Sequence, residues 1–179
     1  MTLEERLQHH KAMAESYHSA YTKQSVKDGA TYDEWKFAPD ATYFSPYFGD
    51  NVIDLAKNPM SVQTSATMEA TSYSVTLPDW KPLSFESWAS EDGFVMKTHF
   101  GGHDKDGVMH DFYAYGFVKT NEKDEITHWE THVSPEYNDF LDFTLGVHGP
   151  FKHGAHEYMA AVAKRLAQAG VDLSKLNLH

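Results

Sequence analysis

Three short turns between residues 83 and 134 constrain the fold of this chain more than any other feature. Each contains aspartate together with glycine or asparagine, and each separates stretches rich in aromatic and β-branched residues. The turns are Glu91-Asp92-Gly93, Asp104-Lys105-Asp106-Gly107 and Asn121-Glu122-Lys123-Asp124. Consecutive strands joined by such hairpin turns form an antiparallel meander. The pattern predicts strands near 83–90, 93–103, 108–120 and 125–134.

The segments around this meander are expected to be mainly helical. Thr2 and Glu5 match a capping box, and apolar residues at helical spacing predict a first helix through about Lys23. The Ala-rich segment His156 to Ala169, followed by Gly170, predicts a last helix. Between these helices we expect a weakly helical or irregular stretch at 27–37, a strand at 41–48, a short helix near 59–70 within loops, and a loop-like segment at 135–149.

Composition limits the classes of protein to which the chain can belong. Its 179 residues, 41% apolar and 23% charged, fit one globular domain, 1–179, rather than a disordered chain. We expect a core of about 5–145 and a C-terminal helical extension of about 150–179. The lack of cysteine excludes disulfides and thiolate metal sites, and suits a reducing compartment.

Charge and hydropathy narrow the partners and the location. The formal net charge of −11, without a compensating basic cluster, makes nucleic acid a poor partner. No apolar run approaches the roughly 20 residues of a membrane span. We therefore expect a cytoplasmic protein without a membrane segment. The 10 Tyr, 11 Phe, 4 Trp and 12 His suit a small aromatic ligand, although core packing also explains aromatic residues.

Two stretches carry a resemblance to a known family. Phe37-Ala38-Pro39-Asp40-Ala41-Thr42-Tyr43-Phe44-Ser45-Pro46 and Asp124-Glu125-Ile126-Thr127-His128-Trp129-Glu130, with the element order of residues 5–145, resemble the nuclear transport factor 2-like superfamily. That superfamily includes ketosteroid isomerases, scytalone dehydratases and SnoaL-like polyketide cyclases. The resemblance implies a cone-shaped α+β fold, with a curved antiparallel sheet wrapped by N-terminal helices around one pocket, and a C-terminal helix. Such a fold hosts many reactions and names none of them.

The resemblance also implies which residues face the pocket. The implied catalytic residues are Lys97, His99, His103, Tyr43 and Tyr21, and the implied substrate-binding residues are Tyr17, Ser45, Tyr47, Asp111, Tyr113, Tyr115, Trp129 and Thr131, with Val133 beside them. Other outcomes stay open, because Lys97 can be a solvated lysine, His103 an exposed turn residue, and the tyrosines ordinary core. A second dehydratase histidine is replaced near Tyr73, and the isomerase carboxylate pair is not reproduced.

A second resemblance concerns the reaction. Ser45-Pro46-Tyr47-Phe48-Gly49 and Val147-His148-Gly149-Pro150 look like the bacterial diarylpropane lyases of this superfamily. These release formaldehyde from lignin-derived dimers and leave a stilbene, without metal or organic cofactor. The resemblance thus implies a cofactor-independent lyase acting on a phenolic aromatic molecule. A SnoaL-like cyclase, dehydratase or isomerase, or a non-catalytic binder of an aromatic ligand, remains the alternative.

Two further rows of side chains are expected on the convex face of the sheet. His128, Glu130 and His132 have metal-ligand chemistry, but the resemblance places them away from the pocket, so we expect no metal. Phe112, Ala114, Gly116 and Val118 form an apolar row that subunit association would cover. We therefore expect a homodimer or homotrimer.

Overall fold

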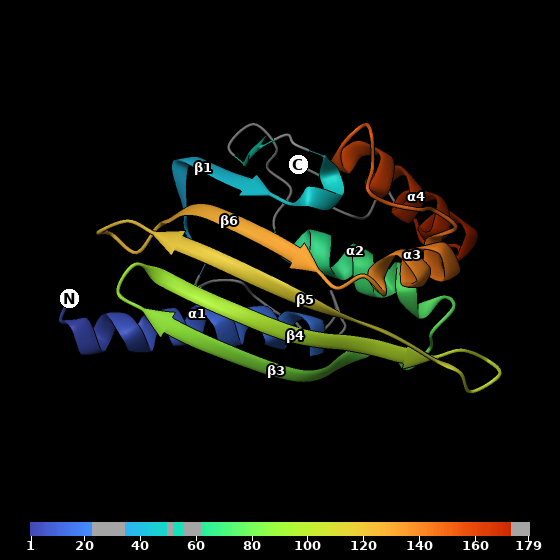
Figure 1. The fold of residues 1–179 in the computed structure, drawn as a ribbon, viewed down its shortest axis with the longest axis horizontal. Coiled ribbons are helices and arrows are strands. Elements are labelled where there is room, and N and C mark those ends of the chain that lie inside the picture. Colours follow the sequence, from blue (N-terminus) through green and yellow to red (C-terminus); the bar gives the residue numbers. More distant parts are fainter. Residues whose placement is uncertain (23–34, 50–51, 56–61, 173–179) are drawn as a thin grey trace.

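The computed structural model describes residues 1–22, 35–49, 52–55 and 62–172. Within these residues it contains a six-stranded sheet and helices at both ends of the chain (Figure 1). The strands are β1 (Phe37–Phe44), β2 (Ile53–Asp54), β3 (Lys81–Ser90), β4 (Gly93–His103), β5 (Met109–Thr120) and β6 (Ile126–Val133), and the helices are α1 (Leu3–Thr22), α2 (Val62–Ser74), α3 (Tyr137–Leu145) and α4 (Ala155–Gln168). The stretch expected at 27–37 lies largely outside the described residues, as does the start of the helix expected near 59.

The sheet runs in the order β2-β1-β6-β5-β4-β3. The meander from β3 to β6 is antiparallel, as the turns predict. The pairing of β1 with β6 is parallel, so the expectation of a wholly antiparallel sheet is wrong at this pair. The long connection through α2 and the meander allows it, because parallel neighbours need a crossover whereas antiparallel ones need only a hairpin.

The first hairpin turn requires a glycine for a physical reason. Gly93 has a φ of 144°, and an added Cβ would lie 1.9 Å from the carbonyl oxygen of Val118. Both the backbone conformation and the close approach of β5 exclude a side chain here. The glycine that marks this turn in the sequence is therefore required by the turn conformation between β3 and β4 and by the close approach of β5.

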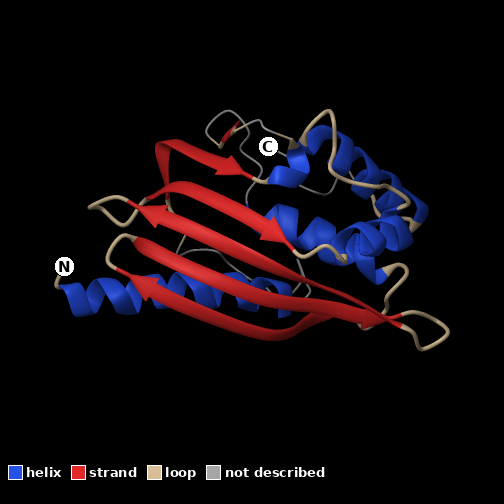
Figure 2. Ribbon diagram, in the orientation of Figure 1, coloured by secondary structure: helices blue, strands red, loops and turns tan. Residues whose placement is uncertain are grey.

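One face of the sheet packs against helices, and we call it the inner face. Figure 2 shows α1 and α2 behind the sheet and α3 and α4 beyond the end of β6. On β4 the inner residues are Phe94, Met96, Thr98 and Phe100, each at most 3% exposed. The facing side of α1 contributes Met13 and Ala14, which are fully buried. The opposite, outer face of the sheet carries the alternate residues.

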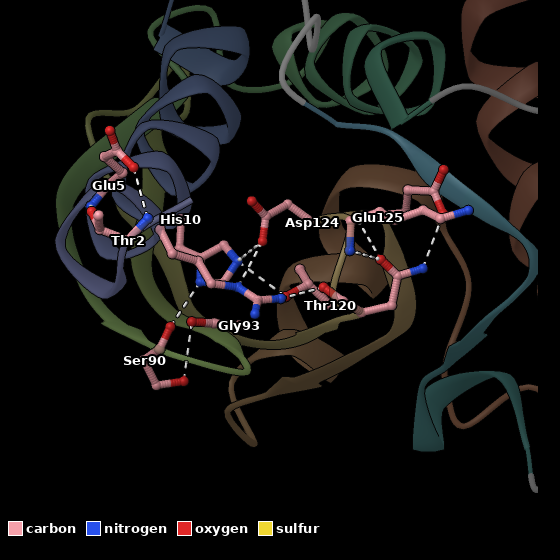
Figure 3. A network of polar contacts seen from close by, with 11 residues as sticks. Thr2, Glu5, His10, Ser90, Gly93, Thr120, Asp124 and Glu125 are labelled. Carbon is pink, nitrogen blue, oxygen red and sulfur yellow. Dashed lines mark hydrogen bonds and ion pairs between the residues drawn. The ribbon is translucent and has the colours of Figure 1, made fainter.

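Helix α1 is anchored to two turns of the meander by a buried polar network (Figure 3). His10 is fully buried, with Nδ1 2.7 Å from the carbonyl oxygen of Ser90 and Nε2 3.0 Å from Oγ1 of Thr120. Nδ1 must donate, because a carbonyl oxygen only accepts. Arg6 Nε lies 2.7 Å from Oδ1 of Asp124, a buried residue with a φ of 58°. The network fixes where α1 crosses the sheet.

The start of α1 follows the expected capping box. The backbone N–H of Glu5 donates to Oγ1 of Thr2 at 3.2 Å, and the N–H of Thr2 donates to Oε2 of Glu5 at 2.7 Å. These contacts lower the pKa of Glu5.

Among the described residues, none of the helices has the length and apolarity needed to cross a membrane.

Two expected elements differ from the structure. The expectation of a loop at 135–149 is wrong, because residues 137–145 form α3. This short helix buries Phe140 and Leu141 and is capped after Leu145 by Gly146, whose φ is 68°. Tertiary packing stabilises a nine-residue helix that would be marginal alone. The first strand ends at Phe44 instead of continuing to 48, because the 3-10 helix η2 (Pro46–Phe48) follows it.

Candidate active site

A cavity of about 1060 Å³ lies between the inner face of the sheet and the helices α1, α2 and α4. Its walls are mainly aromatic, with tyrosines from six elements, namely α1, β1, η2, α2, α3 and α4. The tyrosines and tryptophans of the lining are Tyr17, Tyr21, Tyr43, Tyr47, Tyr73, Tyr137, Tyr158, Trp35, Trp80 and Trp129. Walls of this kind, with a few polar groups among them, are typical of small-molecule sites.

Asp54 and Glu69 are the carboxylates of the described cavity lining, and Glu69 is the one that lies on a helix. It lies on α2, one helical turn before Tyr73, so both side chains point from the same helix face into the cavity. The hydroxyl of Tyr21 donates to its Oε2 at 3.0 Å. Protein surrounds Glu69, yet part of its surface stays open to the cavity. A ligand in the cavity can therefore reach this carboxyl.

Burial dominates the protonation of Glu69. It raises the pKa of this carboxyl from 4.5 to about 7, while hydrogen bonds with Tyr21 and Tyr158 pull the pKa back down. Close to neutral pH, Glu69 is therefore divided between its charged and neutral forms. A general base or acid works best with a pKa of this kind. The geometry thus makes Glu69 the principal candidate for proton transfer.

The tyrosines around Glu69 serve as neutral hydrogen-bond donors. Burial raises the pKa of Tyr43 to about 12, and burial also raises the pKa values of Tyr17 and Tyr137. Near neutrality these side chains remain phenols, able to donate to an oxygen of a ligand. The cavity therefore combines the Glu69 carboxyl, whose pKa lies near neutrality, with several neutral phenol donors.

Part of the expected site does line the cavity. The structure brings together there Tyr17, Tyr21, Tyr43, Ser45, Tyr47, Trp129, Thr131 and Val133. They come from α1, β1, the start of η2 and β6. Trp129 packs edge-on against Tyr43 and Tyr17, with ring centroids 4.8 and 6.1 Å apart. The expected orientation of β1, β6 and α1 is confirmed, and the roles of these residues remain predictions.

The expected orientation of β4 and β5 is wrong. Lys97, His99, His103, Asp111, Tyr113 and Tyr115 are absent from the cavity lining, and on both strands the alternate residues face inward. On β4 the alternate residues Phe94, Met96 and Phe100 are apolar, and their burial against the helices determines this orientation. The outward residues instead contact one another, Glu86 or Asp79, on the outer face or at its end.

The outward residues of β4 and β5 form ion pairs and ring contacts on the outer face. Lys97 Nζ lies 3.2 Å from Oε1 of Glu86 and 5.5 Å from the ring centre of Tyr113. His99 Nε2 lies 2.6 Å from Oδ2 of Asp111. The ring of His99 also stacks on Tyr113, with centroids 4.3 Å apart. These are the contacts of a solvated sheet surface.

His103 also lies outside the cavity. It is exposed at the end of β4, and its Nδ1 lies 2.8 Å from Oδ2 of Asp79. The alternative that the sequence leaves open for His103, an exposed residue at a turn, is the one the structure adopts. The same carboxylate of Asp79 accepts the backbone N–H of His103, at Oδ1 and 2.6 Å.

Of the two sets of side chains expected on the convex face of the sheet, the structure places one on the outer face and the other on the inner face. His128, Glu130 and His132 do lie on the outer face, with His132 bonded to Glu130 and Thr42 Oγ1 2.8 Å from His128 Nδ1. Within the part of the chain that the structure describes, no cluster of three or more such residues could hold a metal ion. The row of Phe112, Ala114, Gly116 and Val118 is buried on the inner face, so its expected outward orientation is wrong.

The residue that sequence reasoning missed is Glu69. Residues 50–82 lack a clear period, so the face of α2 that enters the cavity could not be assigned from pattern. One signal was available, since Glu69 is the only charged residue between Val62 and Leu77. A single carboxylate in an otherwise uncharged helical segment has to reach solvent, a partner or a cavity.

Known proteins resemble this chain in structure but not in sequence. No family model matches the sequence, and neither does any curated protein. A candidate SnoaL-like polyketide cyclase from Jannaschia Sp. CCS1 is 9% identical, with a TM-score of 0.51 over 78% of this chain and 93% of that chain. A nuclear transport factor 2-like protein of unknown function from Cytophaga hutchinsonii is 11% identical, with a TM-score of 0.48 over 72% of this chain and 99% of that chain.

A further similar structure is a steroid delta-isomerase from Pseudomonas aeruginosa, which is 13% identical, with a TM-score of 0.43 over 90% of this chain and 93% of that chain. At such identities, structural likeness speaks to the fold alone. The likeness to the Jannaschia protein agrees with the curved sheet, the helices on its inner face and the cavity between them. The chain thus has an α+β fold similar to that of the Jannaschia protein.

Proposed function

We propose that this protein is a cofactor-independent acid–base enzyme that acts on a phenolic aromatic small molecule, with Glu69 as its proton acceptor. The observation that supports this most directly is the position of Glu69, a carboxyl with a pKa raised to about 7 by burial in an aromatic cavity. Tyr21, which donates to Glu69 at 3.0 Å, is a candidate proton donor for a leaving oxygen.

The cavity supports an aromatic substrate of more than one ring. Its volume of about 1060 Å³ lies just above the usual range for small-molecule sites. Among the described lining residues there is no lysine or arginine to bind a phosphate or a carboxylate. Stacked and edge-on rings around phenolic hydroxyls suit a neutral, ring-bearing molecule with hydroxyl groups.

Within this class, our preferred reaction is the conversion of a lignin-derived diarylpropane-1,3-diol to a stilbene, formaldehyde and water. Glu69 accepts the proton of the phenol, while a tyrosine protonates the benzylic hydroxyl, which leaves as water and generates a quinone methide. The tyrosinate left by this step then takes the proton of the primary alcohol, which breaks the bond between the alcohol carbon and the chain. Formaldehyde departs, the electron pair restores the aromatic ring, and the phenolate regains its proton from Glu69. No redox step occurs, and the protons balance.

The alternatives use the same groups differently. A dehydratase or isomerase would also need the Glu69 carboxylate, but would release no formaldehyde. A non-catalytic binder would need only the aromatic walls. Loss of the carboxylate therefore separates catalysis from binding.

The experiment is to incubate purified, chelator-treated protein with a panel of phenolic dimers and to assay released formaldehyde and stilbene absorbance. We expect turnover by the wild type, and a kcat lower by about 10²-fold or more in Glu69→Gln with binding retained within about tenfold. Glu122→Gln, which removes an exposed turn carboxylate, is the matched control.

Two results would contradict the proposal. Wild-type turnover by Glu69→Gln would remove Glu69 from the mechanism. Tight binding of panel members without any conversion would favour the binder. Conversion without formaldehyde would keep the acid–base site but replace the lyase reaction by a dehydration or an isomerisation.

A further inference from the structure

Behind Glu69, three buried tyrosines bring their hydroxyls together. The Tyr73 hydroxyl lies 2.5 Å from that of Tyr158 and 3.3 Å from that of Tyr137. Tyr158 also hydrogen-bonds to Glu69. These residues belong to α2, α3 and α4, three helices that meet at one end of the cavity. The result is a continuous chain of hydroxyls that ends on the carboxyl.

The chain has one self-consistent direction when Glu69 is charged. A phenol carries one proton to donate and accepts through its lone pairs, whereas a carboxylate only accepts. Tyr158 must therefore donate to Glu69, which leaves its oxygen to accept from Tyr73. Tyr73 can in turn accept from Tyr137. Each link orients the next toward the charge, and bonds in such a chain polarise one another.

We propose that Tyr158, with Tyr73 and Tyr137 behind it, is a positioning network that holds Glu69 as a carboxylate ready to accept a proton. This inference deepens the proposed function of Glu69 and rests on it. A carboxyl buried among aromatic rings without donors would stay protonated at neutral pH and could not act as a base. The chain of hydroxyls therefore stabilises the charged form of a carboxyl that is otherwise surrounded by aromatic rings.

The rings of the network are held independently of their hydroxyls. Tyr158 is 1% exposed, and its ring packs against Phe48 and Phe151 with centroids 5.6 and 5.7 Å away. The ring of Tyr73 packs edge-on against Phe140 at 4.9 Å. Replacing either tyrosine by phenylalanine should therefore remove one donor and preserve the packing. Far-UV circular dichroism and urea unfolding would confirm that each variant folds.

A titration of Glu69 tests the network without a substrate. Protein labelled with carboxyl-¹³C glutamate is titrated by NMR, and the Glu69 resonance is assigned as the one that Glu69→Gln removes. Tyr158→Phe should raise the midpoint of Glu69 by about one to two pH units, the range expected for one lost hydrogen bond to a charged group. Tyr73→Phe should raise it by less, because Tyr73 acts through Tyr158.

A conservative tyrosine change outside the cavity provides the control. Tyr115→Phe, on the outer face, should leave the Glu69 midpoint unchanged. An unchanged or lower midpoint in folded Tyr158→Phe would overturn the network. A Tyr73→Phe midpoint equal to that of the wild type would overturn the link beyond Tyr158.

Activity then separates this inference from the proposed function. If a substrate is found, the acid limb of kcat/KM should move to higher pH in Tyr158→Phe while KM above that limb stays nearly constant. Loss of turnover in Glu69→Gln with an unmoved acid limb in Tyr158→Phe would refute the network and keep Glu69 as the base. Full turnover in Glu69→Gln would refute the proposed function, whatever the titration shows.

Discussion

Replacing Glu69 by glutamine should make the protein more stable above neutral pH, although it should lower the proposed turnover by about 10²-fold or more. The folded protein holds the pKa of Glu69 at about 7, above its ordinary value of 4.5, because burial penalises the charged carboxylate. Such a group contributes stability that is fully present below pH 4.5 and is lost as pH rises through about 7. Glutamine does not titrate and so escapes this loss.

The size of the effect follows from the two pKa values. A change from 4.5 to about 7, at about 1.4 kcal/mol per pH unit, corresponds to about 3 kcal/mol. This is an upper limit, because glutamine forms weaker hydrogen bonds with Tyr21 and Tyr158 than a carboxylate does. Relative to the wild type, Glu69→Gln should therefore gain up to about 3 kcal/mol in unfolding free energy at pH 8.5 and close to nothing at pH 4.5.

Urea unfolding of both proteins at several pH values measures this difference. Contributions from all other titrating groups cancel in the comparison, and Glu122→Gln controls for the loss of one negative charge. If the wild type and Glu69→Gln change in parallel across this pH range, Glu69 is not a buried carboxyl with a raised pKa, and the proposed base loses its support. If the difference in unfolding free energy between Glu69→Gln and the wild type increases from pH 4.5 to 8.5, Glu69 destabilises the folded protein, as is common for functional residues.

Other predictions concern the scaffold and the outer face. Asp124→Asn should lower the unfolding free energy by about 1–3 kcal/mol, because Arg6 loses its partner at 2.7 Å, and urea unfolding at neutral pH would measure this. Lys97→Met should leave kcat within about twofold of the wild type, because Lys97 lies outside the cavity; a hundredfold loss would contradict that placement. The outer face exposes 53% of Trp88 and 44% of Phe117, so we expect a dimer or trimer by light scattering, and a monomer at micromolar concentration would oppose this.

The parts of the fold that the sequence predicts well are those fixed by local chemistry. The turn at Gly93 can hold no other residue without strain, and the Thr2–Glu5 capping box makes both of its expected hydrogen bonds. Helix α3 and the inward face of α2 depend instead on packing between segments distant in the chain. No clear periodic pattern in the sequence identifies either of them. The candidate base Glu69 on α2 was therefore identified only from the structure.

The orientation of β4 and β5 shows how one pairing decides many side chains. Residues paired across neighbouring strands share a face of the sheet. Val118 pairs with Trp129 and Gly116 pairs with Thr131, so inward residues on β6 require the even-numbered residues of β5 to point inward. Tyr115 pairs with His132, which puts Tyr115 on the outer face. The expected site combined both sets on one face, which this register forbids.

The same step carries over to β4, where Lys97 pairs with Tyr115 and His99 pairs with Tyr113. The six residues of β4 and β5 that were expected in the site do share one face, but it is the outer face. A shift of one residue in the assumed pairing of β5 with β6 is enough to exchange the two faces for the whole set. The apolar alternation on β4 could have decided the face, because a cavity for an aromatic ligand is continuous with the hydrophobic core. In such a fold the sheet supplies mainly the walls of the cavity, and a helix can supply a buried carboxyl, as α2 supplies the proposed base Glu69.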